Sequence, residues 1–367
     1  MKKCIKGVVI FAIVVIVAMV GWRMLPYESK QIQFVKKMGS GINIGNSLDA
    51  YGLKIYREDA TDIELETYWG NPPITANLFR MIKEAGFSTV RIPVTWQDHM
   101  NDTGEVSKEW MEHVQNIVDM ALEEELYVII NTHHEEWMDF KYDEEEIISR
   151  FTDLWSQIAL RFQDYDEQLL FEGMNEPRLR DSAYEWNDGT KEMRNLINKL
   201  NTVFINTVRD TGGMNEKRYL LICPYAAKYT EQSLEDLEVP SGNIIVSIHM
   251  YYPYRFVENA DSFSEWNPND EKCKEYVNEI ERYFQNFERL FIRKGIPVIL
   301  TEFGCEDKGN LKSRIDWIKT YKNNADKYGI PYIWWDNGKE YMIMDRNNYS
   351  WRYPEIVNAL LEDCNKE

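Results

Sequence analysis

Two glutamates in this sequence stand where a carboxyl group could do chemistry. Glu176 lies in "LLFEGMNEPR" (169–178), directly after Asn175, and Glu302 lies near the end of "IPVILTEF" (296–303). Each follows an apolar run, and a buried glutamate is rare unless it is paired or used. Two carboxyl groups that face each other across a cleft are what hydrolysis of a glycosidic bond needs. One gives a proton to the leaving oxygen, and the other attacks the anomeric carbon or activates water there.

Other polar and aromatic side chains also follow apolar runs that are typical of strands. These residues are Asn46, Arg91, His133, His134, His249, Tyr251 and Trp335. Read singly, Arg91 is a structural ion-pair partner as easily as a functional group, and the histidines could be core residues or metal ligands. Together they form a pattern, because such residues follow seven of the eight apolar runs.

Those eight runs alternate with helical patterns. They are 42–46, 89–94, 127–132, 168–174, 219–223, 243–250, 296–303 and 330–336. Several are continuously apolar, as parallel strands buried on both faces are. Segments between them, such as "SKEWMEHVQNIVDMALEEE", repeat apolar residues at three- and four-residue spacing. We therefore predict an α/β fold, a (β/α)8 TIM barrel with a single catalytic domain. A doubly wound sheet is the alternative, but "INIGNSLDA" lacks its G-x-G-x-x-G turn.

In such a barrel the active site forms at the carboxyl ends of the strands. Glu176 and Glu302 are 126 residues apart, about three βα units, so we expect them on opposite flanks of one cleft, with Glu176 as the acid/base. Arg91 would hold a neighbouring glutamate charged. Asn175 offers an amide to a sugar 2-hydroxyl, and Tyr251 a hydrogen bond to the nucleophile. Trp335 offers a stacking surface.

Metal-assisted hydrolysis is the second reading of these residues. His133, His134 and His249 with a glutamate could form a metal cluster. No H-x-H pair lies on the first apolar run, so we rank this reading lower and predict no metal site.

Composition narrows the class of partner. The net charge is −19 and the pI about 4.9, which argues against nucleic acid and anionic membranes as partners. The 12 Trp and 22 Tyr suit either a core or a sugar-binding cleft. Five cysteines show no C-x-x-C pair, so a structural zinc site is not expected and buried free thiols are the default.

The N-terminus has the pattern of a targeting segment. Three lysines precede an apolar run over residues 8–20, which is short for a bilayer span. No small-x-small cleavage site follows. We predict a signal peptide or membrane anchor over residues 1–29, with 7–22 as the possible tether, and a catalytic domain over 30–367. The domain is then expected to be secreted or held at the cell surface.

The motifs "VRIPVTW", "NTHHE", "FEGMNEPR", "IHMYYP" and "TEFG" strongly resemble those of glycoside hydrolase family 5, in the family's order and over nearly the whole chain from about residue 35. The details "GINIGNSLDA", "WGNPPIT" and "WWDNG" look like its subfamily 4, whose members are endo-β-1,4-glucanases, many also acting on xyloglucan, mixed-linkage glucan or xylan.

The resemblance implies roles for individual residues. Glu176 matches the acid/base and Glu302 the nucleophile of a retaining mechanism. The shell of the site is matched by Arg91, His133, Asn175, His249, Tyr251 and Trp335, with Asn46 and His134 as further substrate contacts.

The resemblance also implies an activity. We expect a retaining endo-β-1,4-glucanase that needs no metal or organic cofactor and binds β-1,4-glucan. Because nothing in the sequence suggests an assembly surface, we expect a monomer. Xyloglucanase, lichenase, xylanase or mannanase activity and an inactive glycan-binding barrel are the alternatives. Ile42, where many relatives carry Trp, and "CPYAAKY" are departures that we expect in the cleft wall.

Overall fold

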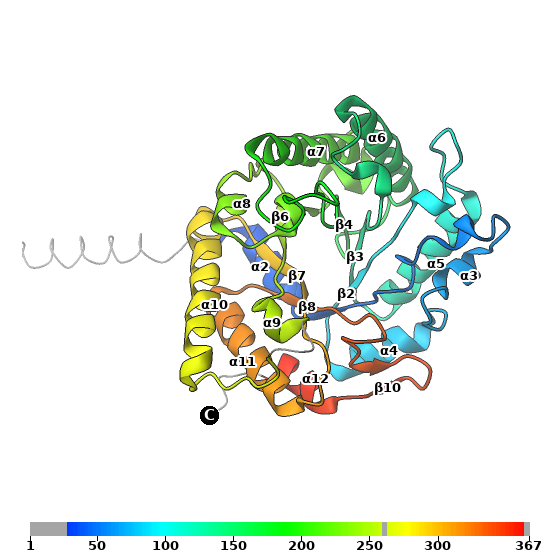
Figure 1. Cartoon of the computed structure of the whole chain (residues 1–367). Coiled ribbons are helices and arrows are strands. Elements are labelled where there is room, and N and C mark those ends of the chain that lie inside the picture. The colour runs from blue at the N-terminus through cyan, green and yellow to red at the C-terminus, as the bar shows by residue number, and fades with distance from the viewer. Residues whose placement is uncertain (1–27, 259–262, 363–367) are drawn as a thin grey trace, which may run out of the picture.

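The computed structural model describes residues 28–258 and 263–362, and its centre is a closed barrel of eight parallel strands (Figure 1). The strands pair in chain order, and the eighth returns to the first, with Ile42 of β1 opposite Trp334 of β8. They are β1 (Gly41–Asn43), β2 (Thr89–Ile92), β3 (Tyr127–Asn131), β4 (Leu169–Glu172), β5 (Leu220–Ile222), β6 (Ile244–His249), β7 (Val298–Phe303) and β8 (Tyr332–Trp334). The predicted barrel is confirmed, and each predicted run overlaps one strand.

Helices surround the strands, as Figure 1 shows in a view along the barrel. Many of them begin at a residue whose side chain accepts a hydrogen bond from the first turn, such as Ser107, Asp143 and Asp270. The helices are α2 (Lys30–Met38), α3 (Asp62–Glu66), α4 (Ala76–Ala85), α5 (Lys108–Glu123), α6 (Glu144–Arg161), α7 (Lys191–Asp210), α8 (Glu231–Glu235), α9 (Tyr254–Val257), α10 (Glu271–Leu290), α11 (Leu311–Tyr328) and α12 (Pro354–Leu361).

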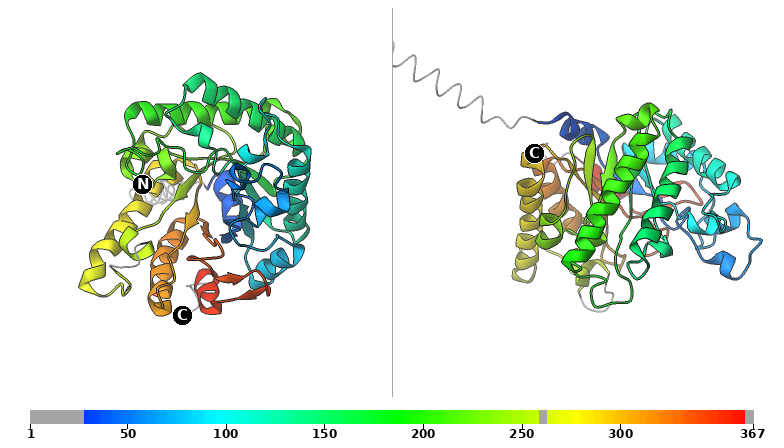
Figure 2. Two further views of the ribbon diagram at one scale, coloured as in Figure 1. Left: turned by 45° about the vertical axis from the view of Figure 1, so that its right-hand side comes forward. Right: turned by 90° about the horizontal axis from the view of Figure 1, so that it is seen from above.

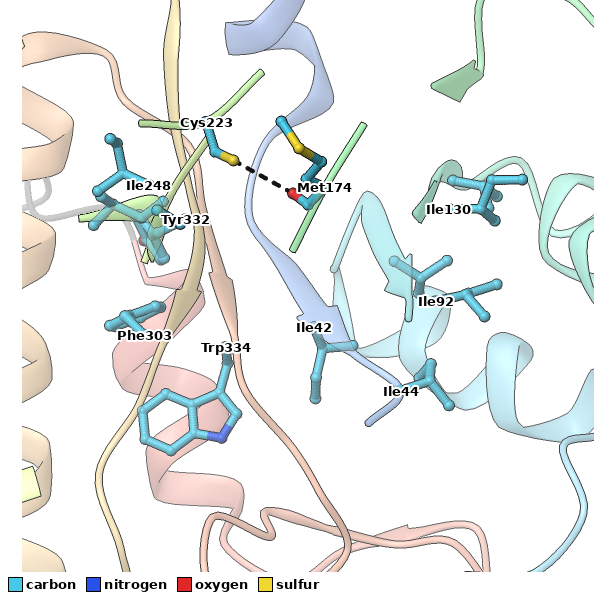
Figure 3. Packing of buried hydrophobic residues seen from close by; sticks show 14 of the residues in the cluster. Ile42, Ile44, Ile92, Ile130, Met174, Cys223, Ile248, Phe303, Tyr332 and Trp334 are labelled. Atoms are coloured by element: carbon cyan, nitrogen blue, oxygen red, sulfur yellow. Dashed lines mark hydrogen bonds between the residues drawn. The ribbon is translucent and has the colours of Figure 1, made fainter. Parts of the chain in front are cut away.

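Side chains alternate along each strand between the helix layer and the barrel interior. The structure has two hydrophobic cores, a large one between strands and helices and a smaller one inside the barrel. On β2, Val90 and Ile92 belong to the large core, while Arg91 belongs to neither. Figure 3 shows part of the large core, including Ile42, Ile92, Ile130 and Trp334. Ile42 has no exposed surface, so our expectation that it lies in the cleft wall is wrong. Ile42 packs in the core between the strands and the helices, whereas its neighbour Asn43 faces the barrel interior.

A second, smaller core fills the barrel interior, and α2 is part of it. Phe34, Val35 and Met38 of α2 join a cluster with inward residues of the strands, namely Tyr127, Ile129, Leu170, Tyr219, Leu221, Ile245, Ile299 and Ile333. The Phe34 ring stacks on Tyr219 with centroids 3.6 Å apart. The right-hand view of Figure 2 shows α2, in dark blue, at one end of the strands. This helix, which the sequence reading did not single out, closes the end of the barrel where the strands begin.

The segment after β8 forms a two-stranded hairpin, β9 (Met344–Asp345) with β10 (Ser350–Trp351). The buried Arg346 beside it bonds Asp336 at 2.9 Å and the carbonyl oxygen of Gly45 at 3.0 Å. These contacts tie the loop after β8 to the loop after β1.

Three cysteines, Cys223, Cys273 and Cys305, are buried free thiols, as expected. Among the helices that the structure describes, none is long and apolar enough to cross a membrane. The predicted N-terminal segment up to residue 27 lies outside the described residues.

The plug formed by α2 predicts a stability effect. Phe34→Ala removes a ring that is 7% exposed and is expected to lower the free energy of unfolding by about 3 kcal/mol, because a buried cavity remains. Urea unfolding followed by tryptophan fluorescence measures it. Lys30→Ala, at an exposed position of the same helix, is the control and should change stability by about 0.5 kcal/mol or less. Equal stabilities for Phe34→Ala and the unsubstituted chain would show that α2 does not support the barrel.

Candidate active site

Arg91 of β2 lies at the centre of a polar layer above the apolar barrel interior. Its side chain has no exposed surface. Its guanidinium contacts Glu172 at 2.6 Å and Glu302 at 2.6 Å, and it donates to the Oδ1 atoms of Asn43 at 2.9 Å and Asn175 at 2.8 Å. Buried charges persist only where they are paired in this way. Arg91 therefore fixes groups from β1, β2, β4 and β7 at one level of the barrel.

Glu302, on β7, is held by three groups. Arg91 binds Oε1, and the hydroxyl of Tyr251 donates to Oε2 at 3.0 Å. Nδ1 of His249 lies 3.5 Å from Oε2. Burial and the charge of Glu302 raise the pKa of Tyr251 well above its usual value, so this phenol keeps its proton and remains a donor. The expected roles of Arg91 and Tyr251 toward this glutamate match the observed contacts.

Glu176 follows β4 and shares His249 with Glu302. Nδ1 of His249 lies 2.8 Å from Oε1 of Glu176. One carboxylate oxygen of each glutamate and a ring nitrogen of His249 lie within 4.8 Å of one another. This short distance between oxygens fits the separation of about 5 Å in retaining glycosidases better than that of about 6.5–9.5 Å in inverting enzymes.

The proton in this site lies between His249 and Glu176. Burial lowers the pKa of His249, but the charges of Glu302 and Glu176 outweigh burial and raise this pKa above its usual 6.5. Against burial, the hydrogen bond and charge of His249 lower the pKa of Glu176 to about 2. Burial raises the pKa of Glu302 above 4.5, with the charge of Glu176 acting in the same direction.

This order differs from the pattern usual for such pairs, in which the acid alone has the raised pKa. The physical reason is His249, a third titratable group within hydrogen-bond distance of Glu176, whose charge favours the ionised form of that carboxyl group.

A set of rings lies beside the two carboxylates. The ring of His133 is parallel to that of Trp335, with centroids 5.9 Å apart. His134 packs edge-on against His133 and also touches Tyr51 and Trp69. Burial lowers the pKa of His133 well below its usual value and that of His134 to about 3, so both rings are neutral. Neutral imidazoles and an indole suit contact with an uncharged hydroxylated ligand.

Asn46 is placed by its backbone. It has a φ of 56°, and its N–H donates to Oδ2 of the buried Asp49 at 3.1 Å. Gly45 beside it must lack a side chain, because a Cβ would lie 2.7 Å from the ring of Trp335. The structure thus brings together all ten residues that the sequence singled out.

The donor sets do not favour a metal ion. Within the described chain, two groups have ligand atoms close enough to hold one, Asp49 with His133 and His134, and Glu176 with His249 and Glu302. The oxygens of Asp49 already accept backbone N–H groups of Asn46 and Ser47. The oxygens of Glu302 already accept from Arg91 and Tyr251, and the Arg91 cation opposes a metal cation there.

Sequence reasoning missed several members of the site. Glu172 of β4 is fully buried and bonds Arg91, Asn131 at 3.0 Å and Ser247 at 2.6 Å. Asp49 shapes the turn that carries Asn46. The signal for Glu172 was present, since a charged residue interrupts the apolar run 168–174 four positions before Glu176.

A comparison with protein families matches residues 49–341 to the model "Cellulase (glycosyl hydrolase family 5)". Among curated relatives, Endoglucanase B of Ruminococcus albus is 39% identical over 337 residues, which cover 89% of this chain and 78% of the relative. Endoglucanase A of Clostridium longisporum is 37% identical over 341 residues, 90% of this chain. The match spans only 65% of that relative's length.

Solved structures are also similar. A GH5-4 broad specificity endoglucanase from Ruminococcus champanellensis with bound cellotriose superposes with a TM-score of 0.85 at 35% identity, covering 91% of this chain and 98% of that one. A GH5 xyloglucan-specific endo-β-1,4-glucanase from a metagenomic library, in complex with cellotriose, gives 0.84 at 36% identity, with 90% and 98% covered. With a family model over most of its length and relatives of this identity, the chain belongs to glycosyl hydrolase family 5, the cellulase family.

Proposed function

We propose that this protein is a retaining endo-β-1,4-glucanase, which cleaves internal bonds of β-1,4-linked glucans. The observation that carries this proposal is the pair Glu176 and Glu302, whose oxygens lie within 4.8 Å of each other at His249. Relatives named as endoglucanases and neighbours with bound cellotriose support the same substrate class.

The first step follows from the contacts of Glu302. Its carboxylate, oriented by Arg91 and Tyr251, attacks the anomeric carbon and forms a glycosyl ester. The bond to the leaving oxygen breaks, and that oxygen takes the proton that Glu176 shares with His249. Because Oδ1 of Asn175 accepts from Arg91, its amide nitrogen is turned to donate toward the sugar 2-hydroxyl.

The second step reverses the proton transfer. Glu176 takes a proton from water, the water oxygen bonds to the anomeric carbon, and the ester bond to Glu302 breaks. The configuration at the anomeric carbon is retained.

Which β-glucan is preferred depends on the loops after the strands. The neighbours include both a broad specificity and a xyloglucan-specific enzyme. We propose that β-1,4-glucan is the main substrate of this protein, and that mixed-linkage glucan and xyloglucan are the next most favoured substrates.

Replacing the nucleophile tests the reaction. Glu302→Gln keeps the side-chain shape but cannot form the ester, so reducing-sugar release is expected to fall on the order of 10³-fold or more. The panel is carboxymethylcellulose, barley β-glucan, xyloglucan, xylan and mannan. Glu271→Gln, on the exposed surface of α10, is the matched loss of one carboxylate and should leave activity unchanged.

The same digest distinguishes the stereochemistry. Proton NMR of the first product should show the β-anomer before mutarotation. An α-anomer would contradict retention, and full activity of Glu302→Gln would contradict the assigned nucleophile.

The titrating groups predict a bell-shaped pH dependence of kcat/KM. The reaction needs Glu302 ionised, so activity rises with pH through a pKa raised above 4.5. It also needs the proton between Glu176 and His249, so activity falls again as pH passes a pKa raised above 6.5. Thermal melts at the same pH values separate titration from unfolding. An alkaline limb below 6.5 in a folded protein would show that His249 does not hold this proton.

We further propose that the enzyme acts outside the cytoplasm. The support is the basic and then apolar segment in residues 1–29, and a polymer substrate that does not cross membranes. Cell fractionation with mass spectrometry of the N-terminus tests it. A shortened protein in the medium indicates a signal peptide, an intact protein in the membrane fraction indicates a tether, and an intact protein in the cytosol refutes the proposal.

A further inference from the structure

Arg178 lies two residues after Glu176 and faces it. Its Nη1 donates to the backbone carbonyl of Glu176 at 2.9 Å and lies 3.5 Å from the carboxylate oxygen Oε2. Both side chains are largely buried, with 15% of Arg178 and 18% of Glu176 exposed. At this depth a cation and a carboxylate in contact interact more strongly than at the surface.

The guanidinium of Arg178 is held from two further sides. Nε donates to Oε1 of Glu185 at 3.2 Å, and the ring of Trp186 lies 4.0 Å from the guanidinium carbon. Oε2 of Glu185 in turn accepts from the N–H of Asp181 at 2.9 Å. Contacts with a carboxylate and an aromatic ring restrict the rotamers of a planar guanidinium, so Arg178 stays directed at Glu176.

The loop that carries these residues is anchored by the segment after β5. The N–H of Ala226 donates to the carbonyl of Pro177 at 3.0 Å, from a left-handed backbone with φ of 52°. Oη of Tyr225 accepts from the N–H of Leu179 at 3.1 Å and donates to the carbonyl of Tyr184 at 3.0 Å. Through these hydrogen bonds, the segment "CPYAAKY" anchors the loop that follows Glu176. Tyr225 and Ala226 are buried rather than in the cleft wall.

Several charged or titratable groups face Glu176. His249 and Glu302 approach from β6 and β7, His134 from the loop after β3, and Glu258 from the end of α9. His134 is neutral, and the carboxylates oppose the charge of Glu176. Among the described residues in contact with Glu176, Arg178 is the one cation that keeps its charge when the site loses its proton.

The second step of the proposed reaction needs Glu176 in its ionised form, which a neighbouring cation favours. After the first step, the proton that Glu176 shared with His249 has gone to the leaving oxygen, and Glu176 must stay ionised in a buried site until water arrives. Arg91 stabilises Glu302 in the ionised form, but its ion pairs are with Glu172 and Glu302 and do not include Glu176.

We propose that Arg178 is a positioning residue for the acid/base, which orients Glu176 and stabilises its ionised form for the water-activating step. The proposal rests on the proposed function and extends it. Arg91 and Arg178 then serve the two catalytic carboxylates separately, with His249 as the group between them. Glu185 and Trp186 hold Arg178 in place and limit how much of its charge acts on Glu176.

The experiment measures the pH dependence of kcat/KM on soluble β-glucan for Arg178→Gln. Without the cation the proton of the Glu176–His249 pair is held more tightly, so the alkaline limb is expected to move up by about one pH unit. On an aryl cellobioside with a good leaving group, where the second step limits turnover, kcat should fall several-fold at acid pH. Arg180→Gln removes the same charge from the same loop without a contact to Glu176, and its limb should stay in place.

Glu185→Gln gives an independent arm with the opposite sign. The glutamine amide oxygen can still accept from Nε of Arg178 and hold it in place, but the negative charge that opposes Arg178 is gone, so the alkaline limb is expected to move down. A purely structural role for Arg178 would lower activity in both variants without moving the limbs in opposite directions.

Each outcome has one reading. Opposite shifts in Arg178→Gln and Glu185→Gln, with Arg180→Gln unchanged, support the proposal. If Arg178→Gln does not fold, a downward shift in Glu185→Gln supports it and an unchanged limb overturns it. If the variants fold and the enzyme is active, an unchanged alkaline limb of the pH profile overturns the proposed role of Arg178. If the unsubstituted enzyme is inactive on every β-glucan, the proposed function is refuted instead.

Discussion

The ion pairs of Arg91 with Glu172 and Glu302 are the interaction on which the site depends. A fully buried guanidinium is tolerated only if its N–H groups find acceptors, and removing one partner of such a pair strands a charge in a medium of low polarity. Here the acceptors come from Glu172, Glu302, Asn43 and Asn175. The position of Glu302 is thus fixed by the same contacts that make the buried arginine tolerable.

This constraint links the chemistry to closure of the barrel. Arg91 on β2 reaches β1, β4 and β7, so its partners meet only when the strands have closed in the correct register. Inward residues alternate along parallel strands, so Asn43, Arg91 and Glu172 meet in the barrel interior together with the apolar residues Ile129 and Leu170. The helix α2 seals the opposite end. The polar layer therefore rests on a packed core and not on a water-filled channel.

The sequence predicted the barrel and the residues at its strand ends because both leave local signals. Continuous apolar runs mark buried parallel strands, and the motif around each run marks its end. It did not predict which side of a run faces inward, because a run apolar on both faces carries no alternation. Ile42 was misplaced for this reason and Glu172 was overlooked. The role of α2 was missed because Phe34 packs on strands far from it in sequence. The pKa shifts of the two glutamates could not be predicted, because they depend on the distances from His249 to both of them.

Charge balance in the finished site leaves one mobile proton. Glu172 offsets Arg91, and Glu185 partly offsets Arg178, so two catalytic carboxylates face the remaining positive charge of His249. Both arginines keep their protons at any working pH. His249 is the one cation of this set that can release a proton, and Glu176 is the carboxylate nearer to it, at 2.8 Å against 3.5 Å for Glu302. In the proposed mechanism, that difference in distance makes Glu176 the acid/base and leaves Glu302 as the nucleophile. The fold creates this difference because it places Glu302 in an ion pair with Arg91 and Glu176 within hydrogen-bond distance of His249.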